Sequence, residues 1–170
     1  AMSTLSPGDL VTFRAASLDD ATRCYAIESA AYPADEAATL DKIRTRILGY
    51  PEGFLIMELD GEIVGFINSG CAFDVEMSDE EFKELVGHDP AAPNVVIMSV
   101  VVDPQHQGQG LSSVLVTEFI THTREHGKRS IHLMCKESLV PMYAKYGWKY
   151  TKPSDSTHGG VSWHEMVLEL

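Results

Sequence analysis

The chain has 170 residues, of which 44% are hydrophobic and 22% charged, as is typical of one soluble domain with a sizeable core. Its 25 acidic and 13 basic residues give a net charge of −12. That charge disfavours binding to nucleic acid or to anionic membranes and suits a small cationic substrate. Three widely spaced cysteines, without a Cys-x-x-Cys pair or paired histidines, indicate neither a disulfide framework nor a metal site.

These features set expectations for the whole molecule. We expect an N-terminal tail at residues 1–10 and a single domain at residues 11–170, because no linker or internal repeat divides the chain. No apolar run is long enough to cross a bilayer, and no basic segment followed by an apolar one marks an export signal. We therefore expect a cytoplasmic protein that is a monomer or a weak dimer.

Apolar periodicity and capping signals predict the elements of the domain. Ser17, Thr39, Ser78 and Ser138 stand where helix N-caps are expected, and Asp60-Gly61 is typical of the turn of an antiparallel hairpin. In chain order, the predicted elements are a strand at 11–15, helices at 18–31 and 40–48, strands at 54–59 and 63–69, a short helix at 79–87, a strand at 94–102, a helix at 111–127, a strand at 130–135, a helix at 139–146, and strands at 148–150 and 161–168.

This order combines hairpins with strand–helix–strand crossovers, so both antiparallel and parallel pairing are expected. The strand at 94–102 is apolar on both faces, a pattern that belongs in the middle of a covered sheet. The sequence therefore predicts an α/β (α+β) fold with a mixed central sheet of about seven strands flanked by helices.

Residues 105–110, Gln-His-Gln-Gly-Gln-Gly, connect that central strand to the helix that begins at Leu111. Glycines permit positive φ and close backbone approach, and a helix N-terminus offers unpaired N–H groups that attract phosphate. The spacing matches neither a P-loop nor the full dinucleotide fingerprint, which argues against a simple nucleotide hydrolase. The loop predicts a site for a phosphate-bearing cofactor.

The order of elements, together with Gln105-x-x-Gly108-x-Gly110, resembles the GNAT superfamily of acetyl-CoA-dependent N-acetyltransferases. Residues 133–143, Leu-Met-Cys-Lys-Glu-Ser-Leu-Val-Pro-Met-Tyr, are similar to the arylalkylamine, or serotonin, N-acetyltransferases, which share the Leu-Met-Cys start and the Leu-Val-Pro-x-Tyr core. The resemblance covers nearly the whole chain. It implies a GNAT fold and direct transfer of acetyl from acetyl-CoA to a small arylalkylamine, such as serotonin, tryptamine or phenethylamine, in a ternary complex.

The resemblance also implies roles for particular residues. The central strand would bind the pantetheine arm of coenzyme A through its backbone, and the loop would bind the pyrophosphate. Tyr143 would donate a proton to the departing thiolate, and Met134 would line the amine pocket. The expected cofactor-binding residues are Met98, Ser99, Val100, Gln105, His106, Gln107, Gly108, Gln109, Gly110 and Leu111.

The reaction also needs a proton acceptor, because an alkylamine with a pKa of about 10.4 is protonated at neutral pH. Vertebrate members of the family use two histidines whose positions fall on Asn94 and Val96 here, and neither of these residues is a base. The chain thus resembles the non-vertebrate branch. Glu36 resembles the glutamate proposed as the base in insect relatives; a solvated loop acid and an ordered-water relay to bulk are the competing interpretations.

Other functions remain open from the sequence. The same fold acetylates polyamines or protein amines in some enzymes. The missing histidine pair also raises the possibility of a non-catalytic acyl-CoA-binding sensor, although the presence of Tyr143 argues against that interpretation.

Overall fold

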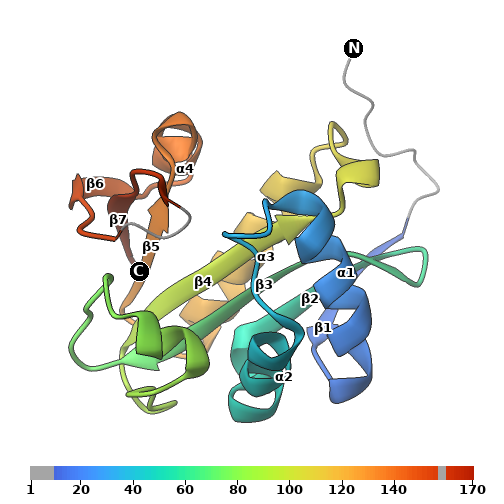
Figure 1. Cartoon of the computed structure of the whole chain (residues 1–170), viewed down its shortest axis with the longest axis horizontal. Coiled ribbons are helices and arrows are strands. Elements are labelled where there is room, and N and C mark those ends of the chain that lie inside the picture. Colours follow the sequence, from blue (N-terminus) through green and yellow to red (C-terminus); the bar gives the residue numbers. More distant parts are fainter. Residues whose placement is uncertain (1–9, 157–159) are drawn as a thin grey trace.

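The computed structural model describes residues 10–156 and 160–170 and contains one seven-stranded sheet in the order β1-β2-β3-β4-β5-β7-β6 (Figure 1). The strands are β1 (Val11–Ala15), β2 (Phe54–Leu59), β3 (Glu62–Ala72), β4 (Asn94–Val102), β5 (Ser130–Cys135), β6 (Lys149–Pro153) and β7 (His164–Glu169). The helices are α1 (Ala21–Ala31), α2 (Leu40–Gly49), α3 (Leu111–Glu125) and α4 (Val140–Lys145), with short 3-10 helices η1 (Leu18–Asp20), η2 (Pro51–Gly53), η3 (Glu80–Glu84), η4 (Pro104–His106) and η5 (Glu137–Leu139).

The N-terminal half of the sheet is an antiparallel meander. β1 pairs with β2, β2 with β3, and β3 with β4. Asp60 and Gly61 both have positive φ, 51° and 84°, which is the backbone that a tight hairpin turn between twisted strands requires. The hairpin predicted from Asp60-Gly61 is therefore confirmed.

The two halves of the sheet meet at a parallel pair. β4 pairs with β5 from Asn94 to Val96, and β7 then lies between β5 and β6. Beyond Val96 the two central strands separate, and Figure 1 shows them diverging. Mixed pairing and seven strands are as the sequence predicts, and the divergence leaves one edge of β4 open in the middle of the sheet.

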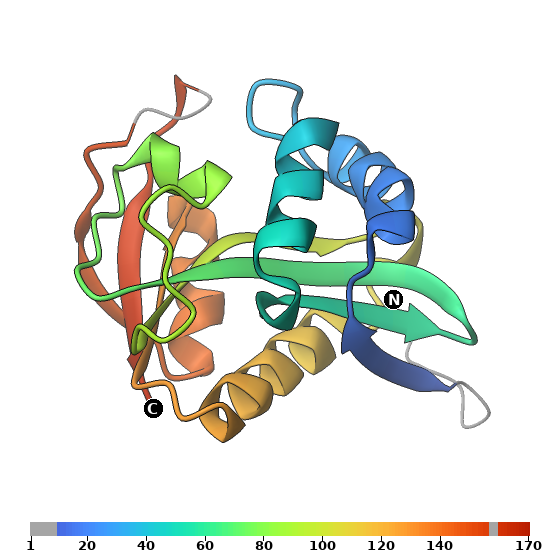
Figure 2. The same cartoon turned by 90° about the horizontal axis from the view of Figure 1, so that it is seen from below.

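Helices cover both faces of the antiparallel half, with α1 and α2 on one face and α3 on the other (Figure 2). Their apolar faces form two separate cores. Residues of α1 and α2 pack on Phe54, Ile56 and Phe66, whereas residues of α3 pack on the opposite face of the sheet with the C-terminal strands. Because the helices that flank the strand divergence come from different parts of the chain, side chains distant in sequence meet there.

Two predicted caps are wrong. Asp79, not Ser78, caps the insertion, because its carboxylate accepts the amide N–H of Glu81, and the insertion is a 3-10 helix. Ser138 lies inside η5, which has Lys136 as its N-cap, so the turn begins two residues earlier than predicted. The last strand begins at His164, later than predicted. No helix among the described residues is long and apolar enough to cross a membrane.

Candidate active site

A pocket opens where β4 and β5 separate. Its empty volume is about 1140 Å³ with the open mouth included. Walls come from both diverging strands, from α2 and from the loop that joins α1 to α2. Among the lining residues are Glu28, Tyr32, Glu36, Lys42, Arg46, Val96, Ile97, Met98, Ser99, Val100, Leu133, Met134, Cys135, Lys136, Leu139, Tyr143 and Trp163.

The wall formed by β4 is irregular in its pairing with β3. Asn68 pairs with Ser99 and Ser69 with Ile97, so Met98 is an extra residue that bulges from the ladder. This stretch of β4 is also not paired with β5, because the pairing of the two strands ends at Val96. An extended ligand can therefore run along β4 and form the hydrogen bonds that a neighbouring strand would otherwise form.

The loop at residues 105–110 leads from this open edge to α3. Gly108 and Gly110 have φ values of 82° and 76°, and a Cβ built at either would meet nothing within 4 Å. The first helical hydrogen bond runs from the amide of Val114 to the carbonyl of Gly110, so the amides of Leu111 and the next two residues have no partner inside the helix. The conformation and open space fit an anion at the N-terminus of α3.

Asp103 fixes the start of that loop. Its carboxylate accepts the amide N–H of Gln105 at 3.0 Å and pairs with Arg23 of α1 at 2.8 Å. These two contacts outweigh the effect of burial and hold the pKa of Asp103 below its usual value. Its second oxygen also lies 3.6 Å from Nδ1 of His106. The structure therefore turns His106 toward Asp103.

Tyr143, on α4, also lines the pocket. Its side chain is 5% exposed and packs edge-on against Trp148, with ring centroids 5.6 Å apart. Burial raises the pKa of Tyr143, and the neighbouring Tyr32 raises it further. The phenol consequently keeps its proton at neutral pH and faces the pocket as a hydrogen-bond donor.

Glu36 also reaches the pocket, from the loop between α1 and α2. Its side chain is only 3% exposed, so the solvated-acid interpretation is wrong. The carboxylate forms a 2.7 Å ion pair with Nζ of Lys136, the residue that follows β5. The structure thus brings Glu36 and Tyr143 to one pocket, as the sequence predicts, and adds a lysine that the sequence had not indicated.

A buried polar network beneath β4 was also missed. Glu28 of α1, 2% exposed, accepts the hydroxyl of Ser99 at 2.9 Å and the amide of Ala38. Oδ1 of Asn68 lies 3.0 Å from the same hydroxyl oxygen and accepts a hydrogen bond from Nη1 of Arg46 at 3.3 Å. Arg46, 3% exposed, also donates through Nε to the carbonyl of Lys83, and burial lowers its pKa. The network ties both N-terminal helices to the bulge in β4.

Other polar and aromatic side chains near β5 and β7 differ in whether they line the pocket. Met134 and Trp163 line the pocket, and the sulfur of Met134 accepts the hydroxyl of Ser154 at 3.3 Å. Asn94 bonds the carbonyl of Phe73 and the hydroxyl of Ser130, so it has a structural role. His164 on β7 bonds the hydroxyl of Tyr150 on β6 and is not among the lining residues.

Comparisons with known proteins agree with this architecture. The model of the acetyltransferase (GNAT) family matches residues 18–148. A serotonin N-acetyltransferase of Mesocricetus auratus is 29% identical over 162 residues, which are 93% of this chain and 77% of the relative.

Solved structures show the same fold. The loading GNATL domain of CurA from Lyngbya majuscula superposes with a TM-score of 0.81 at 17% identity, over 94% of this chain and 98% of that one. The structure of yncA from Salmonella typhimurium with its cofactor acetyl-CoA superposes with a TM-score of 0.68 at 22% identity, over 95% of this chain and 94% of that one. With its diverging central strands and glycine loop, the chain belongs to the GNAT family of acetyltransferases, whose acetyl donor is acetyl-CoA.

Proposed function

We propose that this N-acetyltransferase acetylates the primary amine of a small arylalkylamine. The observation that carries the proposal is that Glu36 and Tyr143 line the same pocket as the bulge at Met98. The serotonin N-acetyltransferase relative supports an arylalkylamine, and the net charge of −12 favours a cationic substrate. The apolar lining, which includes Val96, Leu133 and Trp163, suits an aromatic ring.

Acetyl-CoA supplies the thioester that is transferred. The open edge of β4, at Met98, Ser99 and Val100, would hold its extended pantetheine arm. Residues Gln105 to Leu111, with two glycines at positive φ and a helix N-terminus, would hold its pyrophosphate. A bulge at Met98 also leaves backbone N–H groups available to hydrogen-bond the thioester oxygen.

The chain supplies the proton transfers. Glu36 takes a proton from the incoming ammonium, and its near-complete burial favours contact with a cation. Tyr143 keeps its proton at neutral pH and donates a hydrogen bond to the departing sulfur, whose model thiol pKa is about 8.5. Tyr143 is part of the apolar core, and the loop that carries Glu36 lies between α1 and α2, which both pack on the sheet.

A mixed amine panel tests the substrate class. Serotonin, tryptamine, phenethylamine, spermidine and a lysine-containing peptide are incubated together with acetyl-CoA and the full chain, and products are identified by mass spectrometry. Acetylation of the aromatic amines in preference to the others is expected. Product from spermidine or the peptide alone would replace the arylalkylamine with those classes, and tight acetyl-CoA binding without product would favour a sensor.

Glu36→Gln tests whether Glu36 is the proton acceptor in this reaction. The amide keeps the size of the side chain but accepts no proton, so kcat/KM for the preferred amine should fall about 100-fold. The pH dependence of kcat/KM should also change shape. An unaltered pH profile with normal turnover removes Glu36 from the mechanism. Glu125→Gln, at the exposed end of α3, is the matched control.

A further inference from the structure

In the structure without substrate, the carboxylate of Glu36 already forms an ion pair with a lysine of the protein. Nζ of Lys136 lies 2.7 Å from Oε1 of Glu36, and both side chains line the pocket that contains Tyr143. The two partners differ in exposure, since the Glu36 side chain is 3% exposed and that of Lys136 is 37%. The carboxylate is thus buried in the wall of the pocket, whereas the lysine side chain is partly exposed to solvent.

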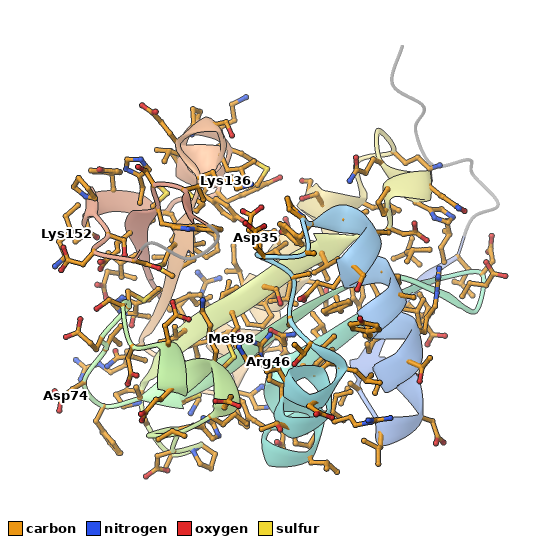
Figure 3. The ribbon with its side chains drawn as sticks, in the orientation of Figure 1. Asp35, Arg46, Asp74, Met98, Lys136 and Lys152 are labelled. Atoms are coloured by element: carbon orange, nitrogen blue, oxygen red, sulfur yellow. The ribbon has the colours of Figure 1, made fainter. Side chains whose placement is uncertain are left out.

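This ion pair crosses the opening between the two halves of the sheet. Glu36 lies on the loop after α1, which packs on β3 and β4, whereas Lys136 directly follows β5. Figure 3 shows Lys136 beside the loop that carries Asp35, the neighbour of Glu36. The pair therefore spans the gap in which the pocket lies.

The chemistry of the occupant matches the chemistry of the substrate. A lysine side chain is a primary alkylammonium ion, as is a protonated arylalkylamine at neutral pH. Two such cations held against one buried carboxylate repel each other, so binding of one weakens the contact with the other. We propose that the Lys136 ammonium occupies the substrate-ammonium subsite of the free enzyme and that the incoming amine displaces it.

Displacement is feasible for this side chain in particular. The lysine side chain is flexible and partly exposed, so it can rotate into water, whereas the side chain of Glu36 is buried. While no amine is bound, Lys136 also compensates a buried negative charge that would be costly without a cation. Lys136 is therefore a specificity-determining residue, because a cationic ligand displaces it from Glu36 and a neutral ligand does not. This inference rests on the proposed role of Glu36 as the acid that receives the amine.

The test compares two ligands that the enzyme cannot N-acetylate. N,N-dimethylphenethylamine carries the ammonium group, and 2-phenylethanol has a similar shape without the charge. Calorimetric binding to the full chain should show that Lys136→Met binds the cation about five- to tenfold more tightly, while the neutral alcohol changes less than twofold. Lys145→Met, which removes an exposed charge at the end of α4, should behave as the wild type.

Further variants separate competition from a structural effect. Lys136→Arg keeps the charge and should leave the ratio of the two affinities near that of the wild type, whereas Lys136→Gln should repeat the effect of methionine. In a Glu36→Gln background, Lys136→Met should no longer change cation binding, because the shared carboxylate is gone. Thermal melting confirms that each variant is folded.

Either of two results would overturn the inference. One is a Lys136→Met variant that binds the cation no more tightly than the wild type. The other is an equal gain for cation and alcohol, which would show that the lysine merely fills space. Failure of the proposed function looks different, because the wild-type enzyme would then acetylate no arylalkylamine while the binding comparison still reports on Lys136.

Discussion

The hydroxyl of Tyr32 donates a 2.6 Å hydrogen bond to the carbonyl oxygen of Val100 on the open edge of β4. Burial, together with the nearby carboxylates of Glu28 and Glu36, raises the pKa of Tyr32 to about 12, so the group stays a donor at neutral pH. Because β5 does not pair with β4 at this position, the Tyr32 hydroxyl supplies the hydrogen bond that a neighbouring strand would otherwise donate to the Val100 carbonyl. It lies on the edge along which the pantetheine arm is proposed to bind.

Tyr32→Phe should therefore strengthen cofactor binding. The hydroxyl competes with the ligand for the β4 edge, and a hydrogen bond of about 1 kcal/mol corresponds to roughly fivefold in affinity. Calorimetry with coenzyme A should show about fivefold tighter binding. Tyr25→Phe, on the exposed side of α1, provides the matched control and should change nothing. Weaker binding by Tyr32→Phe would mean that the hydroxyl assists the cofactor instead of excluding it.

Tyr143→Phe should lower turnover far more than cofactor affinity. Phenylalanine preserves the packing against Trp148 but removes the donor proposed for the departing sulfur. Loss of a general acid typically costs 10²- to 10⁴-fold, so kcat should fall at least about 100-fold while the Kd for acetyl-CoA stays within about threefold. Tyr146→Phe, on the same segment, should retain near-normal kcat. Unchanged turnover in Tyr143→Phe would remove Tyr143 from the mechanism.

The sequence predicted those parts of the site whose residues are neighbours along the chain. The strand at 94–102, the glycine loop and the start of α3 are consecutive, so local pattern and turn chemistry define them. Tyr143 came from a continuous eleven-residue resemblance. The position of the strand at the centre of the sheet also followed from its apolar character on both faces.

The polar interior of the pocket could not be predicted in the same way, because its partners lie far apart in sequence. Glu28 and Ser99 are separated by 71 residues, and Arg46 and Asn68 by 22. The sequence around a buried acid on a helix does not indicate which distant residue it will contact. Lys136 belongs to the segment that resembles the arylalkylamine N-acetyltransferases, but the sequence assigned it no role. Its contact with Glu36 depends on the divergence of two strands.

Asp103→Asn should weaken cofactor binding although Asp103 lies just before the cofactor loop and not within it. The substitution removes the charge that pairs with Arg23 and weakens the bond that fixes Gln105, so the loop loses order before it meets the anion. We expect coenzyme A to bind roughly three- to tenfold more weakly, since charge-assisted hydrogen bonds contribute about 1–2 kcal/mol. Asp41→Asn removes a largely exposed partner of Arg44 and should leave affinity unchanged. Equal affinities in the two variants would contradict this role for Asp103.

The stability of the fold should decrease as the pH falls below about 6.5, the ordinary pKa of histidine. His88 accepts the amide N–H of Cys71 through Nδ1 at 2.8 Å, so protonation of that nitrogen breaks the bond. Burial lowers the pKa of His88, and it does the same for His132 on β5. Each of these histidines therefore has a lower pKa in the folded chain than in the unfolded chain. Between those two pKa values, the unfolded chain binds more protons than the folded one. In that window the free energy of unfolding decreases as the pH falls.

His88→Gln isolates this contribution, because an amide oxygen can accept the Cys71 amide but does not titrate in this range. Urea denaturation at pH 7.5 and pH 5.0 should show a smaller loss of stability for the variant than for the wild type. Asp20 and Asp103, whose pKa values are held below the ordinary aspartate range by their arginine partners and backbone bonds, lose their contribution only at more acidic pH. An identical loss in both proteins between pH 7.5 and 5.0 would assign the decrease to groups other than His88.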